Sequence, residues 1–303
     1  MVCYYPLKAY RSKSVNPKTG KRKMVFNYRD SLDGISHTLP CGQCIGCRLE
    51  KSRQWAMRCM HEASLHDDNC FITLTYNDEN LPENGSLDVS HFQKFMKRLR
   101  ERIGVSIRFF HCGEYGDTTL RPHYHALIFG YDFPDKTLWS IRNGNRLYVS
   151  PFLDKVWKKG HTSVGSLTFE SAAYVARYAM KKVTGEQAQE HYRIADPKTG
   201  EVFDRLPEYT TMSLRPAIAA GWYKSFKSDV YPRDYVVVNG VKVKPPRFYD
   251  ILYEIDDPPS FEKIKRARKR AALLHKQNNT PERLRVRERV LKAKISTLKR
   301  GLD

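Results

Sequence analysis

The chain has 303 residues, of which 41% are hydrophobic, and its 53 Lys and Arg against 33 Asp and Glu give a net charge of +20. This composition favours one large domain with extensions over two smaller domains. No apolar run approaches the about twenty residues that cross a bilayer, and the N-terminus lacks a signal-peptide pattern, so we expect a soluble cytoplasmic protein with no membrane association. The basic charge predicts a polyanionic partner, nucleic acid above all, and disfavours a hydrolase of small phosphoesters.

The first forty residues are basic and rich in turn formers, and Asn16 to Gly20 read as a turn between short strands. Cys41, Cys44 and Cys47 follow at a spacing that, in a reducing compartment, indicates metal ligation more than disulfides. A closed zinc site needs a fourth ligand. Cys3 is the first choice, with Cys59, Cys112 and His61 as alternatives, and three free thiols in a turn are the simpler interpretation.

The central part of the chain alternates strands and helices. Periodicity and breakers predict a helix at 48–66, a strand at 71–76, a helix at 91–102 with Ser90 as its N-cap, strands at 107–114 and 123–130, a helix at 152–159, a strand at 163–168 and a helix at 170–182. This order is typical of an α+β, ferredoxin-like split unit, with an antiparallel sheet and helices on one face.

The pattern weakens from 196 to 259, where Lys244-Pro245-Pro246 and Asp257-Pro258-Pro259 read as linkers. From 261 onward, fifteen Lys or Arg face four acidic residues, which predicts a basic helical tail that contacts phosphates. We therefore expect an N-terminal extension with the cysteines and a helix (1–66), a catalytic core (67–220), a linker and peripheral segment (221–260) and the basic tail (261–303).

His123 and His125 lie two apart on a predicted strand, so both imidazoles project from one face. Glu114 ends the preceding strand, and a short turn would bring it beside them. Two imidazoles and a carboxylate can hold Mn²⁺ or Mg²⁺ while leaving positions for a phosphate oxygen. An isolated His-x-His is more often an ordinary strand feature, but its Arg-Pro turn and the nearby tyrosines favour ligation here.

Tyr174 and Tyr178 are four residues apart on the last predicted helix, with Lys181 and Lys182 one turn further. Tyrosines at this spacing usually pack in a core, but the lysines continue the same face with charge. A phenol becomes a nucleophile when nearby cations stabilise the developing charge. The pattern thus predicts attack on a phosphodiester, with a covalent phosphotyrosine and a free 3′-hydroxyl as products.

Four motifs in this order resemble those of HUH-superfamily rolling-circle replication initiators, most closely those of gokushovirus-type microviruses. They are Phe71–Tyr76, Gly113–Gly116, Arg121–His125 and Tyr174 to Lys182, and the cysteine segments at 1–7 and 40–48 are also similar. The resemblance spans roughly residues 1 to 220.

The resemblance implies the HUH endonuclease fold and an enzyme that nicks one strand of origin DNA, stays attached through tyrosine and later rejoins the displaced circle. It implies Glu114, His123 and His125 as metal ligands, Tyr174 and Tyr178 as nucleophiles, and Lys181 or Lys182 as the supporting lysine. We expect DNA contacts from basic residues outside these motifs or beside them, namely Arg121, Arg177, Arg215, Lys265, Arg266 and Lys269.

The expected partners are single-stranded or origin DNA, a host helicase, since the sequence has no visible P-loop, and the host replication machinery. A phage-encoded protein would act in the bacterial cytoplasm. The alternatives are a zinc-containing nucleic-acid-binding protein without catalysis, or an HUH relaxase or transposase that shares the histidine pair. The oligomeric state and the origin sequence are not encoded in any pattern we recognise.

Overall fold

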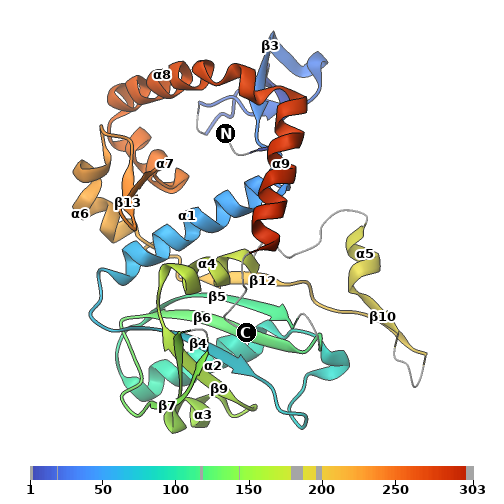
Figure 1. The fold of residues 1–303 in the computed structure, drawn as a ribbon, viewed down its shortest axis with the longest axis vertical. Coiled ribbons are helices and arrows are strands. Elements are labelled where there is room, and N and C mark those ends of the chain that lie inside the picture. The colour runs from blue at the N-terminus through green and yellow to red at the C-terminus, as the bar shows by residue number, and fades with distance from the viewer. Residues whose placement is uncertain are drawn as a thin grey trace. The chain divides into compact units, whose positions relative to one another are not determined.

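The computed structural model describes residues 3–18, 20–116, 119–142, 144–178, 187–195 and 200–297, and Figure 1 shows its elements in chain order. The described residues form two compact units. One contains the residues up to 51 together with 263–297, and the other contains 52–262. Helices α1 (Ile45–Ala63) and α8 (Pro258–Leu274) carry residues of both units. In the described part of the chain, none of the helices combines the length and apolar content that a bilayer span requires.

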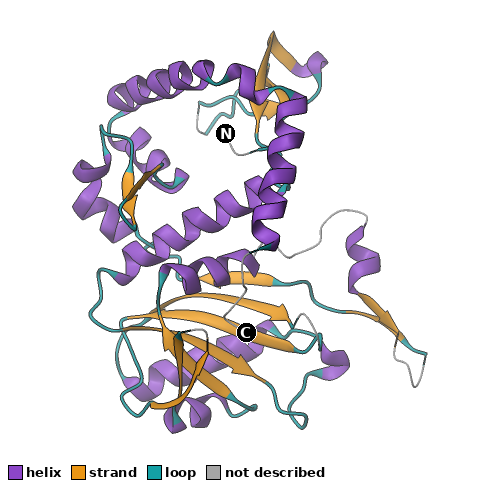
Figure 2. Cartoon of the chain, in the orientation of Figure 1, coloured by secondary structure: helices purple, strands orange, loops and turns teal. Residues whose placement is uncertain are grey.

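The second unit is built on a seven-stranded sheet, shown in orange in Figure 2, whose neighbouring strands are all antiparallel. The strand order is β12-β5-β6-β4-β9-β8-β7. The bounds are β4 (Asn69–Thr75), β5 (Arg108–Tyr115), β6 (Pro122–Phe129), β7 (Thr137–Arg142), β8 (Asn145–Val149), β9 (Thr162–Ser166) and β12 (Tyr209–Met212). The expected mixed α+β architecture with an antiparallel sheet is confirmed.

Two helices pack on one face of this sheet. They are α2 (Val89–Ile103), between β4 and β5 in the chain, and α3 (Pro151–Trp157), between β6 and β9. Their buried side chains form the main core with the inward residues of the sheet, and each fully buried aromatic or aliphatic side chain contributes about 2 kcal/mol to folding. This core contains Ile72, Leu74, Tyr76, Phe92, Phe95, Met96, Leu99, Tyr124, Ile128, Val156 and Trp157.

The opposite face of the sheet is covered as well, which corrects the expectation of helices on one face only. Trp55 of α1 packs against Phe110 of β5, with 5.0 Å between ring centroids. Helix α4 (Phe169–Tyr178) contacts β5, β6 and β12. Ser52 of α1 donates a hydrogen bond to the Ala173 carbonyl at 2.9 Å, which ties α1 to α4. The second face is apolar enough at Phe110 and Leu127 to need a cover of its own.

Helix α2 begins and ends at residues that the local chemistry explains. Asp88, not Ser90, is its N-cap: the Asp88 carboxylate accepts a hydrogen bond from the Ser90 amide at 2.7 Å. The prediction of Ser90 was wrong because both residue types cap helices, and the chain turns helical one residue earlier. Gly104 ends the helix with a positive φ of 67°, a conformation that glycine adopts without strain.

The prolines that read as linkers begin helices instead. Lys244-Pro245-Pro246 leads directly into α7 (Arg247–Asp256), and Pro258 is the first residue of α8. Proline suits a first helical turn because the amide it lacks would have no partner there. The remaining elements of this unit are α5 (Gln187–Tyr192), β10 (Arg193–Ala195), β11 (Val202–Asp204), α6 (Ala220–Val230), β13 (Val236–Val238) and β14 (Val241–Val243).

The first unit joins the two ends of the described chain. Strands β1 (Leu7–Ser12), β2 (Met24–Val25) and β3 (Ser31–Leu39) form a small sheet in the order β2-β1-β3, with the expected turn at Pro17 and Lys18 between β1 and β2. From the C-terminal side it contains most of α8 and all of α9 (Pro281–Ser296), so the basic tail is helical as expected. The 3-10 turns of the chain are Tyr28–Asp30, Glu83–Gly85 and Lys276–Asn279.

A buried aromatic cluster fastens α1 to α6 and α7. The His61 ring stacks on Trp222 with centroids 3.6 Å apart, and its Nδ1 lies 2.7 Å from the Tyr249 hydroxyl. One turn earlier, the Arg58 guanidinium lies between Trp55 and Phe248 at 4.0 and 3.9 Å. Burial lowers the pKa of His61 to about 4, so the ring is neutral in the folded protein at neutral pH.

This lowered pKa predicts a loss of stability in acid. The unfolded chain binds a proton at His61 near pH 6.5, whereas the folded chain binds it only near pH 4, so the stability due to neutral His61 falls as the pH drops through this window. We expect a loss of about 2 kcal/mol between pH 7 and pH 5 from this group. The measurement is the free energy of urea unfolding at both pH values, compared with His61→Gln. Equal pH dependence in the two proteins would contradict it.

Candidate active site

The pairing of β5 with β6 brings three predicted metal ligands onto one face of the sheet. Glu114 pairs with His123, and Cys112 pairs with His125. Residues directly opposite in an antiparallel pair project to the same face, and so do residues two apart on a strand. Glu114, His123 and His125 therefore share a face, while Tyr124 projects into the core on the other side. The strand periodicity expected for the histidine pair is the one observed.

The three side chains converge on one carboxylate oxygen. His123 Nε2 lies 2.9 Å and His125 Nε2 lies 2.8 Å from Glu114 Oε1. One ligand atom from each residue lies within 4.8 Å of the other two. Glu114 is 1% exposed and His125 5% exposed, whereas His123 is only partly buried. The cluster thus opens to solvent on the His123 side.

The charge state of the carboxylate follows from its neighbours. Burial by itself would raise the pKa of Glu114, but the hydrogen bonds and positive charge of His123 and His125 lower it below its ordinary value. The group is therefore an ionised carboxylate at neutral pH. Without a cation, holding both Nε2 atoms against one anionic oxygen requires protons on the imidazoles, and a divalent ion would supply the same positive charge.

Further hydrogen bonds orient both imidazoles. His123 Nδ1 lies 3.1 Å from the Arg121 carbonyl, which can only accept, so the Nδ1 proton is held there and the lone pair of the neutral ring is on Nε2. His125 Nδ1 lies 2.9 Å from the Thr73 hydroxyl on β4. Phe71, also on β4, stacks on His125 at 5.4 Å. Sequence reasoning missed these contacts of Thr73 and Phe71, although both residues lie on the strand it predicted beside the site.

Arg121 braces the hairpin end next to the histidines. Its guanidinium donates to Asp78 at 2.6 Å and to the Tyr76 carbonyl at 3.1 Å. Because the Arg121 carbonyl also accepts from His123, this residue connects the loop after β4 to the histidine strand. The observed contacts of the predicted DNA ligand Arg121 are thus within the protein, and its side chain remains one third exposed.

Helix α4 places a tyrosine ring against the histidine pair. The Tyr174 ring meets His125 edge to face at 5.2 Å between centroids, and it meets Phe71 at 6.4 Å. The Arg177 guanidinium lies 5.8 Å from the centroid of the Tyr174 ring, on the exposed side of the helix. Tyr174 is 7% exposed, so its position is close to that of a core residue, but its nearest aromatic neighbour is a candidate metal ligand.

The rest of the predicted tyrosine motif is described only in part. Tyr178 is the last residue of α4, and its side chain lies outside the description. Lys181 and Lys182 lie outside the described residues. Among the other predicted DNA ligands, Arg215 is exposed ahead of α6, and Lys265, Arg266 and Lys269 are exposed on α8.

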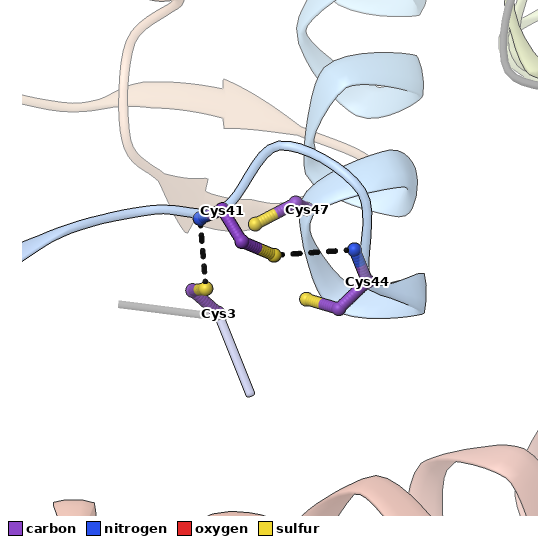
Figure 3. Close-up of side chains that lie close together, drawn as sticks. All are labelled: Cys3, Cys41, Cys44 and Cys47. Atoms are coloured by element: carbon purple, nitrogen blue, oxygen red, sulfur yellow. Dashed lines mark hydrogen bonds between the residues drawn. The ribbon is translucent and has the colours of Figure 1, made fainter. Parts of the chain in front are cut away.

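The four predicted cysteines form a second cluster, in the first unit. Cys3, Cys41, Cys44 and Cys47 place their sulfur atoms within 4.8 Å of one another (Figure 3). A tetrahedral Zn²⁺ with Zn–S bonds of about 2.3 Å needs sulfurs about 3.8 Å apart, so the cluster has the size of such a site. Of the candidates for the fourth ligand, Cys3 joins the cluster, whereas Cys59 and Cys112 are fully buried in the other unit. His61 is engaged with Trp222 and Tyr249.

Backbone amides point at these sulfurs. The amide of Cys41 donates to Cys3 Sγ at 3.2 Å, that of Cys44 to Cys41 Sγ at 3.3 Å, and that of Tyr4 to Cys44 Sγ at 3.3 Å. Burial opposes ionisation, but these contacts and the neighbouring thiols lower the pKa of Cys44 to about 7. Burial also raises the pKa of Cys47, together with its thiol neighbours. The cluster therefore favours a thiolate before any cation is added.

Comparison with known proteins gives consistent matches. The family model for replication-associated proteins of the ORF2 type matches residues 69–183. Replication-associated protein VP4 of Bdellovibrio phage phiMH2K is 35% identical over 85% of this chain and 79% of its own length. Replication-associated protein ORF2 of Spiroplasma virus 4 is 31% identical over 90% of this chain and 87% of its own. Replication-associated protein ORF4 of Chlamydia phage 1 is 29% identical over 73% and 55%. No solved structure matches the chain.

Proposed function

This chain belongs to the family of replication-associated proteins of small phages, and we propose that it nicks one strand of origin DNA through tyrosine and so initiates rolling-circle replication. The resemblance to microvirus replication initiators is thereby confirmed. The observation that carries the nicking proposal is the contact of the Tyr174 ring with His125, inside a cluster of two imidazoles and one carboxylate.

The donor set of this cluster suits a divalent ion. Glu114, His123 and His125 would hold Mg²⁺ or Mn²⁺, since a hard cation that also accepts nitrogen fits one carboxylate and two oriented imidazoles. When bound, the ion supplies positive charge that polarises a phosphate oxygen. Thr73 and the Arg121 carbonyl keep the imidazoles in the orientation that this role needs.

The proposed reaction is transesterification at phosphorus. The Tyr174 oxygen loses its proton and forms the new P–O bond, while the bond to the 3′-oxygen breaks and that oxygen takes up a proton. The products are a strand end linked to tyrosine through its 5′-phosphate and a free 3′-hydroxyl, so the phosphodiester energy is conserved for rejoining. Tyr178 is proposed as the second acceptor, and Lys181 or Lys182 as the cation that stabilises the developing charge.

DNA is the proposed partner, supported by the charge of +20 and by the family. Arg177 lies beside Tyr174 on the exposed side of α4, where a bound strand would pass. Arg121, Arg215, Lys265, Arg266 and Lys269 are proposed as further phosphate contacts, which position DNA without reading its sequence. A host helicase and the host replication machinery are proposed to unwind and copy the template in the bacterial cytoplasm.

The HUH endonuclease fold is part of this proposal. Its support is the order β9-β4-β6-β5 of the four central strands, with α2 and α3 as the crossing helices on one face. This is the arrangement expected of a ferredoxin-like split unit. The histidines then lie on the central strand β6, where backbone pairing on both sides keeps them rigid.

A second ion is proposed for the cysteine cluster. Four sulfurs with amide donors, all from one unit, suit a closed structural Zn²⁺ site with no open position. We assign it no part in the phosphodiester chemistry.

The test uses the whole protein and single-stranded DNA that carries the origin. With Mn²⁺ we expect a covalent protein–DNA adduct that survives denaturation, and mass spectrometry should find the 5′-phosphate on a tyrosine of α4. The same mixture with EDTA should form none. Cleavage without an adduct, or tight DNA binding without cleavage in active Mn²⁺, would overturn the proposal in favour of a hydrolase or a non-catalytic binder, respectively.

A further inference from the structure

The basic C-terminal helix α9 is held by the same cluster that contains the cysteines. Leu284 is buried together with Cys3, Tyr4 and Cys44, and Leu291 packs against this group. The Tyr5 hydroxyl donates to Glu288 of α9 at 2.5 Å. In Figure 1, α9, in red, lies beside the blue N-terminal part of the same unit. The two ends of the described chain therefore meet at the sulfur site.

The contacts of α9 lie on one stripe of the helix. Leu284, Glu288, Leu291 and Ile295 follow one another at spacings of four, three and four residues, and each is buried or partly buried. Such a stripe is the face that a helix presents to its support. Glu288 is satisfied on this face by Tyr5 and by Lys292, which lies 3.3 Å away.

Two rows of cations flank this stripe. Arg285, Arg289 and Lys292 form one row at helical spacing and are exposed, and Arg283, Arg287 and Lys294 form the other. Arg287 is engaged with the Asn278 carbonyl and the Asn279 side chain, at 3.2 and 3.0 Å. As long as the stripe is docked, the first row is presented on a fixed support, as a surface complementary to a phosphate backbone.

The docking group is too small to hold α9 without further stabilisation. Its fully buried members are Cys3, Tyr4, Cys44 and Leu284, so half of it consists of cysteine side chains. Small clusters of this kind depend on a metal or a disulfide for independent stability, and all seven cysteines of the chain are free thiols. A bound Zn²⁺ would fix Cys3 against Cys41, Cys44 and Cys47 and so create the surface on which Leu284 packs.

We propose that the cysteine site, through its zinc, docks α9 and thereby presents a second DNA-binding surface, the row Arg285, Arg289 and Lys292, which holds DNA by its phosphates independently of sequence. This inference rests on the zinc site proposed above but not on the nickase activity. The ordering of α9 is metal-dependent, and the phosphate affinity of the row depends on that order, because a frayed helix loses conformational entropy again each time it binds.

The first experiment measures metal and helix order together in the full chain. We expect one Zn²⁺ per chain by elemental analysis, and none after Cys44→Ser. Stripping zinc with a chelator should speed amide exchange of residues 284–295 by at least about tenfold. Cys59→Ala is the matched control, since Cys59 is buried in the other unit and should leave both zinc and exchange unchanged. Leu284→Asp should keep the zinc but release the helix.

The second experiment measures binding to a random-sequence single strand, which carries no origin. Arg285→Gln with Arg289→Gln should lower affinity about fivefold to tenfold and reduce the salt slope by about 1 to 2. Lys94→Gln with Lys97→Gln removes the same charge from the exposed side of α2 and should change affinity less than twofold. Leu284→Asp should resemble the α9 variant.

Three outcomes would overturn the proposal, and they are distinguishable. Absence of zinc from the purified protein would remove the site itself, while nicking could remain intact. Zinc binding with unchanged exchange of α9 after stripping would show that the metal does not dock the helix. Equal DNA binding by the α9 and α2 variants would show that the row is a solvated face with no role in DNA contact.

Discussion

Replacing Tyr174 with phenylalanine is expected to abolish the covalent DNA adduct and to lower the rate of origin nicking on the order of 10³-fold or more. The substitution removes only the nucleophilic oxygen, because the ring that packs against His125 and Phe71 is retained. The fold and Mn²⁺ binding should therefore persist. The measurement is single-turnover cleavage of an origin strand with Mn²⁺, with the adduct resolved by denaturing electrophoresis.

The control is Tyr131→Phe, which removes a partly buried phenol that packs against Phe133 on the core side. It should cleave like the parent protein. Tyr178→Phe should retain the first cleavage but slow the second strand transfer. If Tyr174→Phe cleaves normally and Tyr178→Phe does not, the assignment of the first nucleophile is reversed, and the edge-to-face contact with His125 is then only packing.

Replacing Glu114 with glutamine is expected to weaken Mn²⁺ binding on the order of 10²-fold and to reduce nicking in step with metal occupancy. The amide keeps the size of the carboxylate but removes the only negative charge that the described residues place between His123 and His125. The measurement is Mn²⁺ affinity by calorimetry together with the Mn²⁺ dependence of cleavage. Glu208→Gln is the matched control, since Glu208 is also buried but pairs with Tyr192 outside the site.

A smaller and correctable effect is expected from Thr73→Val, which removes the hydrogen bond to His125 Nδ1. The loss in metal affinity should be about tenfold, and excess Mn²⁺ should restore cleavage, because the ligands themselves remain. Thr75→Val on the same strand should have no effect, since the Thr75 hydroxyl makes no hydrogen bond to any residue that the structure describes. Failure of excess Mn²⁺ to restore Thr73→Val, or unchanged Mn²⁺ affinity in Glu114→Gln, would contradict a metal role for this cluster.

Local patterns were sufficient for most of the elements in the core. The alternation along Phe71–Thr75 and His123–Phe129 and the stripe of Phe92, Phe95, Met96 and Leu99 each encode a period that neighbouring residues impose on one another. These elements were found within two or three residues of their observed bounds. The short outer strands β7, β8 and β12 were missed, because so few residues gain their strand conformation from pairing with the sheet edge rather than from their own pattern.

The candidate site was predictable in its members but not in its geometry. The histidine spacing determined that His123 and His125 share a face, and the resemblance added Glu114 and Tyr174. The antiparallel register determined that Glu114 lies opposite His123, and this register is an interaction between strands that no single strand encodes. The contacts of Thr73 and Phe71 with His125 likewise depend on β4 pairing with β6, a strand far away in the chain.

By itself, the sequence determined which chemical groups this protein has at its disposal: two imidazoles, a carboxylate, a tyrosine helix, four cysteines and a large excess of positive charge. Only the tertiary structure decided which groups meet. Cys3 joined Cys41, Cys44 and Cys47 instead of Cys59, Cys112 or His61, and α9 docked on that group, because closure of a chain over tens or hundreds of residues depends on the packing of the whole unit. Residue type and short spacing report on neighbours a few residues apart, and contacts across such distances are beyond their reach.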